Sequence, residues 1–372
     1  MDVMRTVQDV LKCCACNACA NICSQNAIKI KTGFEQSKII IDENLCTKCG
    51  LCWKICPTIN KVQKRAPLDC LQGWVKSERK REAAASGGIA SALYDAFIQS
   101  GGTICGCVFE KGSFKLKLSD SYETIEKFTG SKYVKSDVGN IYDEIRRLLK
   151  NDEKVLFVGL PCQVAGLLNY IPFRYQTNLF TVDLICHGTP SIKLLEKHLL
   201  EKGFNISNVE MIKFRKGNEF YLNVDGQDVT KYGMLDSYMF SFLHSLIYTD
   251  NCYSCNYATI ERCSDLTIGD AWGSDLQENE KNKGISVVFY QTEKGKKLLD
   301  LADLELRNFD IELAFANNKQ LSKPAYNEKR QLFFYTLRNE GSFSGAVRKC
   351  YPKVFFRQKI KGILNCLCKS MR

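Results

Sequence analysis

Residues 13–23 read CCACNACANIC, and residues 46–57 read CTKCGLCWKICP. Both stretches contain the spacing C-x2-C-x2-C-x3-C, and each cysteine of the first recurs 33 residues later in the second. Three cysteines separated by two residues wrap one iron–sulfur cluster, and in two-cluster ferredoxins the fourth cysteine ligates the other cluster. The repeat therefore predicts an α+β ferredoxin-type domain that holds two 4Fe–4S clusters.

The crossed ligand pattern assigns these eight cysteines to two clusters, four to each. The first set is Cys13, Cys16, Cys19 and Cys56. The second set is Cys23, Cys46, Cys49 and Cys52. We expect short strands at 27–30 and 39–41, where β-branched residues alternate or run together, and a helix starting at the fourth cysteine of each run. Paired zinc knuckles are the alternative, but they need neither the third CxxC step nor the crossed ligand.

Composition supports metal binding. The chain has 372 residues, of which 20 are cysteine and 3 are histidine. The absence of a secretory signal and of a run of 18 apolar residues predicts a cytoplasmic protein, in which cysteines bind metal rather than form disulfides. The formal net charge of +11 is concentrated in residues 348–372, which carry eight Lys/Arg and no acid. The remainder is close to neutral, which argues against nucleic-acid binding.

Residues 1–60 form the predicted ferredoxin-type domain, 61–69 a linker, 70–340 a mixed α/β body and 341–372 a basic amphipathic tail. In the body, apolar runs at 154–159, 179–186 and 284–290 are each followed by a helical pattern. Alternating strands and helices favour a mainly parallel sheet, with ligands at the carboxyl ends of its strands. Cys162 and Cys186 both lie at such ends.

Two glycine-containing turns are candidates for cofactor binding. The residues Ser86, Gly87 and Gly88 precede a helical pattern with Ile89, Leu93 and Phe97, and a turn of this kind offers free N–H groups to a phosphate. An ordinary helix cap explains the same residues equally well. Ser131, Lys132 and Tyr133 follow Gly130 and supply a hydroxyl, a cation and an aromatic ring, a set that suits a flavin; a plain loop is the alternative.

A second group of cysteines lies in the body: Cys162, Cys186, Cys252 and Cys255. Because Cys252 and Cys255 form a CxxC pair and the other two end strands, a third 4Fe–4S cluster is one interpretation. A buried set of unreactive thiols is the other. His187, which follows Cys186, is a candidate proton donor, although a single histidine is more often structural.

The order of the motifs resembles a known family. After the ferredoxin repeat come SGGI, GSKYV, GLPCQVAG, DLICHGTPS, CxxCxYA and SDLTIGDAWG, between residues 86 and 273. This series resembles the family of coenzyme F420 hydrogenase/dehydrogenase beta subunits. The resemblance implies FAD in the body, favours a body cluster, and implies that Ser86, Gly87, Gly88, Ser131, Lys132 and Tyr133 lie near the flavin.

These patterns predict an FAD-dependent iron–sulfur oxidoreductase. We expect electron transfer between 4Fe–4S clusters and FAD, and hydride transfer to or from a deazaflavin-like (coenzyme F420) or other small acceptor. Arg215, Lys132 and His187 are candidates for holding an anionic substrate. A non-catalytic ferredoxin-type adaptor is the alternative. Expected partners are a one-electron carrier protein such as a ferredoxin or redox enzyme, a small molecule and a second copy of the chain. The tail favours a solvated or partner-packed helix over weak membrane-surface contact.

Overall fold

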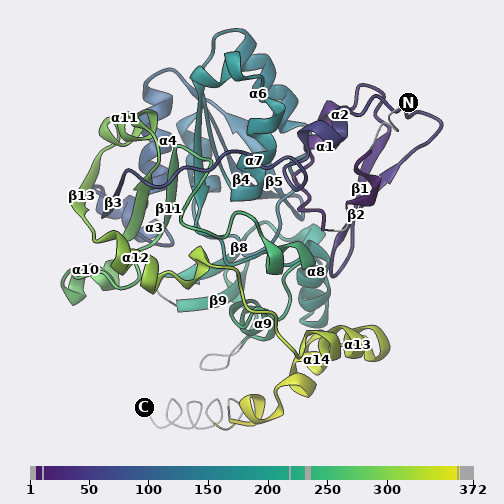
Figure 1. The fold of residues 1–372 in the computed structure, drawn as a ribbon. Helices are drawn as coiled ribbons and strands as arrows, with labels where there is room; N and C mark the ends of the chain where they lie inside the picture. Colours follow the sequence, from purple (N-terminus) through teal and green to yellow (C-terminus); the bar gives the residue numbers. More distant parts are fainter. Residues whose placement is uncertain (1–5, 11, 218, 231–235, 358–359, 361–372) are drawn as a thin grey trace.

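The computed structural model describes residues 6–10, 12–217, 219–230, 236–357 and 360, and Figure 1 shows its arrangement. The helices are α1 Ala18–Ile22, α2 Leu51–Ile55, α3 Glu78–Ala83, α4 Ile89–Gln99, α5 Ile125–Phe128, α6 Ile141–Lys150, α7 Pro161–Tyr170, α8 Ile192–Glu201, α9 Ser237–Leu243, α10 Glu278–Lys283, α11 Glu293–Leu301, α12 Ile311–Asn317, α13 Arg330–Glu340 and α14 Phe343–Cys350. The strands are β1 Ile28–Thr32, β2 Ser37–Ile41, β3 Asp69–Val75, β4 Thr103–Glu110, β5 Ser113–Ser119, β6 Val155–Gly159, β7 Leu179–Leu184, β8 Ile212–Lys216, β9 Glu219–Val224, β10 Gln227–Asp228, β11 Leu266–Asp270, β12 Ser286–Tyr290 and β13 Leu304–Asn308.

The N-terminal domain consists of the β1–β2 hairpin and the short helices α1 and α2. The strands predicted at 27–30 and 39–41 are present as β1 and β2, and the two pair antiparallel. Each helix begins directly after a left-handed residue, Asn17 or Gly50, and ends one residue before the fourth cysteine of its run. The prediction that Cys23 and Cys56 start helices is therefore wrong. The left-handed residue starts the helix early, so each of these cysteines follows the helix end.

The body contains a central eight-stranded sheet of order β13-β3-β12-β11-β7-β6-β4-β5. The strands β4, β6, β7 and β11 are parallel, whereas β5, β12, β3 and β13 pair antiparallel at the two flanks. The mixed α/β body is confirmed, but the prediction of a mainly parallel sheet is wrong. The chain after β11 carries only the short helix α10 before β12, so it reverses beside β11 instead of crossing over the sheet.

Helices cover both faces of this sheet, and β6 shows why. All five residues of β6 are buried, and successive side chains point to opposite faces. Leu156 and Val158 pack in the core that α4 and α11 close, while Val155 and Phe157 pack in the core under α6 and α7. The predicted helical pattern from Ile89 is confirmed, because α4 buries its apolar stripe against the sheet.

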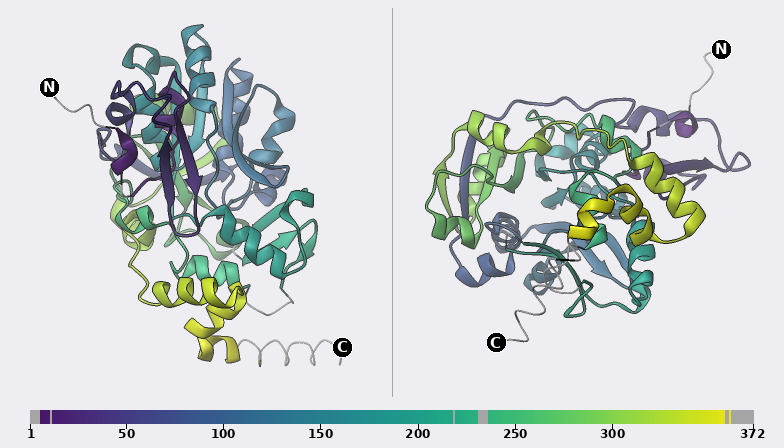
Figure 2. Two further views of the ribbon diagram at one scale, coloured as in Figure 1. Left: turned by 90° about the vertical axis from the view of Figure 1, so that its right-hand side faces the viewer. Right: turned by 90° about the horizontal axis from the view of Figure 1, so that it is seen from below.

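The N-terminal domain lies against α7, on one side of the body (Figure 2). A Cβ atom added at Gly166 of α7 would stand 3.0 Å from the Sγ of Cys16, so a larger residue would require the neighbouring atoms to move by a few tenths of an ångström. The Nδ2 of Asn169 donates to the carbonyl of Asn60 at 2.8 Å. Backbone hydrogen bonds also tie Arg65, within 61–69, to Arg262. The N-terminal domain is thus packed against the body and not merely tethered to it.

The C-terminal helices α13 and α14 pack on each other at the end of the molecule opposite α6 (Figure 1). Phe343, Ala346 and Val347 of α14 are buried in the same apolar core as α8 and α9. The start of the predicted tail is therefore packed, and residues 361–372 lie outside the described residues. No helix in the described ranges has the length and apolar character that crossing a bilayer requires.

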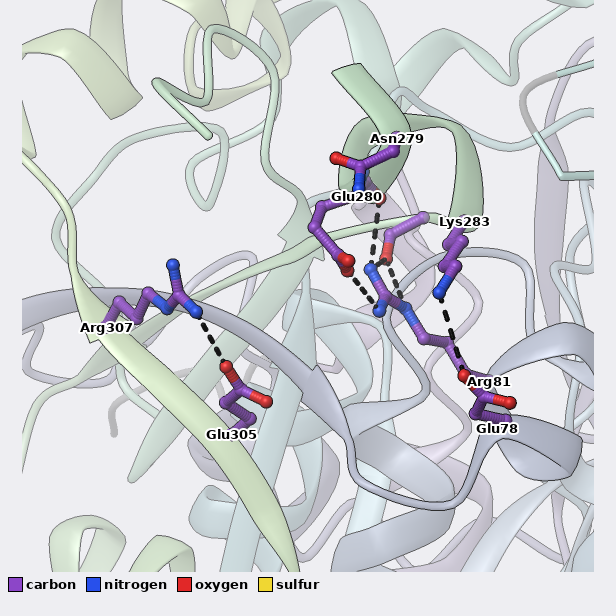
Figure 3. Close-up of polar contacts among 8 residues, drawn as sticks. Glu78, Arg81, Asn279, Glu280, Lys283, Glu305 and Arg307 are labelled. Atoms are coloured by element: carbon purple, nitrogen blue, oxygen red, sulfur yellow. Dashed lines mark hydrogen bonds and ion pairs between the residues drawn. The ribbon is translucent and has the colours of Figure 1, made fainter. Parts of the chain in front are cut away.

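Arg81 of α3 fixes the loop that precedes β12. Its side chain is 6% exposed, and its guanidinium donates to the Glu280 carboxylate at 2.6 Å and to the carbonyls of Glu280 and Gly284 (Figure 3). The same group lies 4.1 Å from the ring centroid of Trp74 on β3. Arg81 therefore clamps α10 and Gly284 against the turn at residues 86–88.

We predict that Arg81→Ala lowers the free energy of unfolding by about 3 kcal/mol, because it leaves buried acceptors unpaired. The matched control is Arg307→Ala, which removes an exposed ion pair with Glu305 near the same Trp74 and should cost at most about 0.5 kcal/mol. Urea unfolding followed by circular dichroism measures both variants. Equal losses would contradict the clamp.

Candidate functional site

The structure places the cysteines of the first predicted set together beside the body. Cys13, Cys16, Cys19 and Cys56 are buried. Burial, and then the charges of Cys13 and Cys56, raise the pKa of Cys19 to about 12. Such electrostatic coupling acts over short distances inside a protein, so Cys56 from the second run lies among cysteines of the first. Cys52 of the second run also acts on Cys19, so the assignment of each fourth cysteine to the other cluster stays a prediction.

The second set lines a small cavity at the far side of the N-terminal domain. Cys23 approaches it from the end of α1, and Cys46, Cys49 and Cys52 from the loop leading into α2. The side chain of Ile28 closes the wall. Cys49 is exposed, whereas Cys52 is buried in the apolar core of this domain. The cavity contains one cysteine of the first run and three of the second, the composition that the crossed pattern predicts.

The donor chemistry of both sets fits iron–sulfur clusters. Within the described residues, no group of three or more Cys, His, Asp or Glu side chains is arranged to hold a single metal ion. A cubane cluster is larger than one ion and holds its four thiolates further apart. All-thiolate coordination is what a 4Fe–4S cluster requires. The eight N-terminal cysteines supply this all-thiolate donor set.

The four body cysteines also converge. Cys162 begins α7 directly after β6, Cys186 follows β7, and Cys252 and Cys255 lie around a 3-10 turn at Asp250–Ser254. Burial, and then Cys252, raise the pKa of Cys186, with smaller contributions from Cys162 and Cys255. Burial, and then Cys162, raise the pKa of Cys255 to about 11. These four thiols, of which Cys252 is buried and the other three are partly buried, form one group at the carboxyl ends of the parallel strands.

Two further side chains join the body thiols to the N-terminal domain. Cys14, adjacent to the predicted ligand Cys13, forms a hydrogen bond with Cys16 that raises the pKa of the Cys14 thiol well above its usual range. A second hydrogen bond joins Cys14 to Cys162 of the body. The ammonium of Lys135 lies 3.3 Å from the Sγ of Cys162. Lys135 was not among the predicted site residues, because a single lysine in a loop carries no recognisable pattern.

A cavity of about 270 Å³ lies next to the body thiols. Its wall contains predicted site residues from four segments of the chain, namely Ser86, Gly88, Ser131, Lys132, Tyr133, Cys186, His187 and Arg215. The parallel strands β6, β7 and β11 end at this cavity, as the rule for ligand sites in such sheets predicts. The structure therefore brings nearly all the predicted flavin and substrate residues to one place.

The turn at residues 86–88 contributes less directly than its pattern suggests. The Ser86 hydroxyl donates to the carbonyl of Ile285, and the Gly87 N–H donates to the Ser286 hydroxyl. Gly87 does not line the cavity. Gly88 has a φ of +77° and caps α4 without a side-chain hydrogen bond, and the first residues of the helix line the cavity. This helix terminus is the group on the turn that suits an anion.

The segment 131–133 forms another wall. The Lys132 ammonium donates to the carbonyls of Phe128, Thr129 and Gly130, and burial lowers its pKa to about 8. Lys132 therefore caps the short helix α5 while its stem lines the cavity. The Tyr133 ring stacks on Phe242 at 4.5 Å between centroids and gives the cavity an aromatic side.

The polar end of the cavity combines His187, Arg215 and Asp270. Burial lowers the pKa of His187 to about 4, so the imidazole is neutral near pH 7, and its Nε2 lies 2.5 Å from the Nε2 of Gln320. The Nη1 of Arg215 donates to Asp270 at 2.6 Å. Asp270 was not predicted as a site residue, although it stands in the SDLTIGDAWG stretch and ends β11.

Comparison with known proteins agrees with this geometry. Residues 12–60 match the 4Fe-4S dicluster domain, and residues 152–310 match the model of the C terminus of the coenzyme F420 hydrogenase/dehydrogenase beta subunit. Over residues 152–310 the body is therefore similar to this family of beta subunits. The family resemblance predicted from the motif series is thereby confirmed, as is an iron–sulfur domain at the N-terminus.

Two curated relatives extend the match within the family. The F subunit of F(420)H(2) dehydrogenase from Methanosarcina mazei is 21% identical over 79% of this chain and 83% of its own length. Coenzyme F420-dependent sulfite reductase of Methanocaldococcus jannaschii is 22% identical over 79% of this chain, but the match spans only 46% of that protein. A chain of the F420-reducing [NiFe] hydrogenase complex of Methanosarcina barkeri aligns over 74% of this chain and 95% of its own, with 17% identity and a TM-score of 0.49.

We predict that Cys13→Ser and Cys56→Ser perturb the same cluster, while Cys46→Ser perturbs the other, because the fourth ligand of each run crosses over. Each variant should lose about four iron atoms per chain. Iron analysis and electron paramagnetic resonance of anaerobically reconstituted protein measure this. Cys70→Ala, a buried thiol on β3, serves as the control and should keep its iron. Loss of the same signal in Cys56→Ser and Cys46→Ser would contradict the crossed assignment.

Proposed function

We propose that this protein is an iron–sulfur flavoprotein oxidoreductase that passes electrons between 4Fe–4S clusters and FAD. The acceptor or donor at the flavin is a small molecule, with a deazaflavin of the coenzyme F420 type as the leading candidate. The proposal includes a third cluster held by Cys162, Cys186, Cys252 and Cys255. Both curated relatives carry coenzyme F420 in their names, which supports the substrate class.

One observation carries the proposal: Cys186 belongs to the body thiols and also lines the adjoining cavity. A cluster held by these thiols would therefore adjoin whatever fills the cavity. The N-terminal cysteines reach the same thiols through Cys14 and Cys162. The three sites form a continuous series from the N-terminal domain to the cavity, as an electron-transfer enzyme requires.

A bound flavin supplies the exchange between single electrons and a hydride pair, which no side chain provides. The residues of this chain would bind and orient it. The N-terminus of α4 faces the cavity and suits the pyrophosphate, and the aromatic side made by Tyr133 and Phe242 suits a planar ring. Lys132 holds the α5 end of this wall through its three carbonyls, so the segment is ordered before a ligand arrives.

At the polar end, Arg215 and Asp270 present a paired charge to the substrate side of the cavity. The neutral His187 offers a hydrogen-bonding nitrogen, and Gln320 fixes the ring orientation. Because His187 stays uncharged near pH 7, it suits accepting or donating a hydrogen bond better than neutralising an anion. Arg215 is the better candidate for contact with a negatively charged group.

The alternative of a non-catalytic adaptor is less well supported. An adaptor needs clusters and a docking surface, but it has no use for a polar and aromatic cavity beside a cluster site. Flavin content and turnover distinguish the two functions. A partner that carries single electrons, such as a ferredoxin or another redox protein, is part of either proposal.

We predict that protein purified without oxygen contains about one FAD and about twelve iron atoms per chain, or about eight iron atoms if the body thiols stay empty. Iron, acid-labile sulfide and flavin analysis measures this composition. Clusters without flavin and without turnover on a soluble acceptor would favour the adaptor and contradict the flavoenzyme.

We predict further that Gly88→Ala weakens FAD binding about tenfold, because the turn at the start of α4 would move to relieve the strain of a side chain at positive φ, about 1–2 kcal/mol. The added Cβ would also lie 2.8 Å from Val75 and displace the turn. Gly101→Ala is the matched control: it lies just beyond the other end of α4, has a φ of +79°, and its Cβ would meet no atom within 4 Å. Fluorescence titration with FAD measures both variants. Equal weakening would show that the α4 N-terminus does not contact the flavin.

A further inference from the structure

Lys135 is a charged side chain that the flavin cavity does not use. The neighbouring residues Val134 and Ser136 line that cavity, whereas Lys135 does not. Its N–H donates to the carbonyl of Pro190 at 2.9 Å, which fixes the backbone next to the Cys186–Pro190 loop. Its ammonium lies 3.3 Å from the Sγ of Cys162.

The ionisable groups closest to this ammonium are cysteine side chains. Cys162, Cys14 and Cys252 are the groups that act on it electrostatically, and no carboxylate of the described residues forms an ion pair with it. Lys135 is partly buried, and an ammonium shielded from water is costly unless an anion accompanies it. A thiol becomes such an anion when it coordinates a metal, since a coordinating thiol is deprotonated. A metal cluster held by the body thiols would supply the anionic thiolates that the Lys135 ammonium requires.

We infer that Lys135 is the counter-cation of a 4Fe–4S cluster held by the four body cysteines, and that its charge raises the reduction potential of that cluster. The inference rests on the proposed function, because it requires the body cluster. A 4Fe–4S cluster with four thiolates goes from a net charge of −2 to −3 when it takes one electron from the one-electron carrier. No proton is needed. A fixed cation at Cys162 stabilises the more negative state, and the N–H···S hydrogen bond acts in the same direction.

The position of Lys135 explains how a raised reduction potential of the body cluster would assist electron transfer. Cys14 of the N-terminal domain contacts Cys162, so the lysine lies where the N-terminal domain meets the body site. Raising the potential on the body side of this contact favours electron flow from the N-terminal clusters towards the cavity. Lys135 thus acts through the body cluster, whose reduction potential it raises, and does not itself contact the substrate.

The test uses the full chain, reconstituted without oxygen, in which each cluster is titrated by potential and followed by electron paramagnetic resonance. Lys135→Met should retain its iron and should lower the midpoint of one cluster by at least about 59 mV, a tenfold change in its one-electron reduction equilibrium. The other two midpoints should not move. Lys135→Arg, which keeps the charge, should have a midpoint close to that of the wild-type protein. If Lys135→Met does not assemble the body cluster, Lys135→Gln is titrated in its place.

The matched control is Lys64→Met. The Lys64 ammonium donates to the carbonyl of Asn256, beside Cys255, and forms no hydrogen bond with a sulfur atom of the described residues, so its removal should change the midpoint much less. Three assembled clusters with unchanged midpoints in Lys135→Met would overturn the inference and leave the flavoenzyme standing. Wild-type protein with eight iron atoms and one FAD would also overturn it without affecting the flavoenzyme. Protein without flavin would contradict the proposed function, while the midpoint shift would still decide the role of Lys135.

Discussion

The close approach of α1 to α7 at Gly166 is the constraint on which the candidate site depends. A Cβ atom at position 166 would lie 3.0 Å from both the Cβ and the Sγ of Cys16, which precedes α1. One turn earlier, the same helix begins at Pro161 and Cys162. A single helix therefore carries both the surface that receives the N-terminal domain and a thiol of the body group. A larger side chain at Gly166 would push the two cysteine groups apart.

The central sheet supplies the other half of the arrangement. Its parallel strands β6, β7 and β11 end at the same edge, and the residues that follow them are Leu160, Ile185 and Ala271. Cys162, Cys186 and Asp270 reach the site from these ends, although they are far apart in the sequence. The antiparallel strands at the two flanks have a different role from the parallel strands. They extend the sheet and bring β12 beside the turn at residues 86–88, where Arg81 holds its leading loop.

The charged side chains in and beside the cavity differ in their partners in ways that residue type alone does not predict. Lys132 and Lys135 are three residues apart in one segment, yet the ammonium of Lys132 is bound by carbonyls and that of Lys135 lies against sulfur. Arg215 is paired with Asp270, and His187 is neutral because it is buried. The lysine that contacts a cysteine is the one that the sequence patterns did not select.

The sequence by itself determined the N-terminal 4Fe–4S domain and the resemblance to the beta-subunit family, because ligand spacing in a short repeat and a series of motifs are local properties that folding does not alter. It also determined α4, α7 and the buried strands, whose patterns match their periods. Only the tertiary structure decided which body cysteines meet, that β12 runs antiparallel, and that Cys14, Cys162 and Lys135 share one contact. These features join residues more than a hundred positions apart, or depend on which of several partners a side chain finds, and no local spacing encodes that choice.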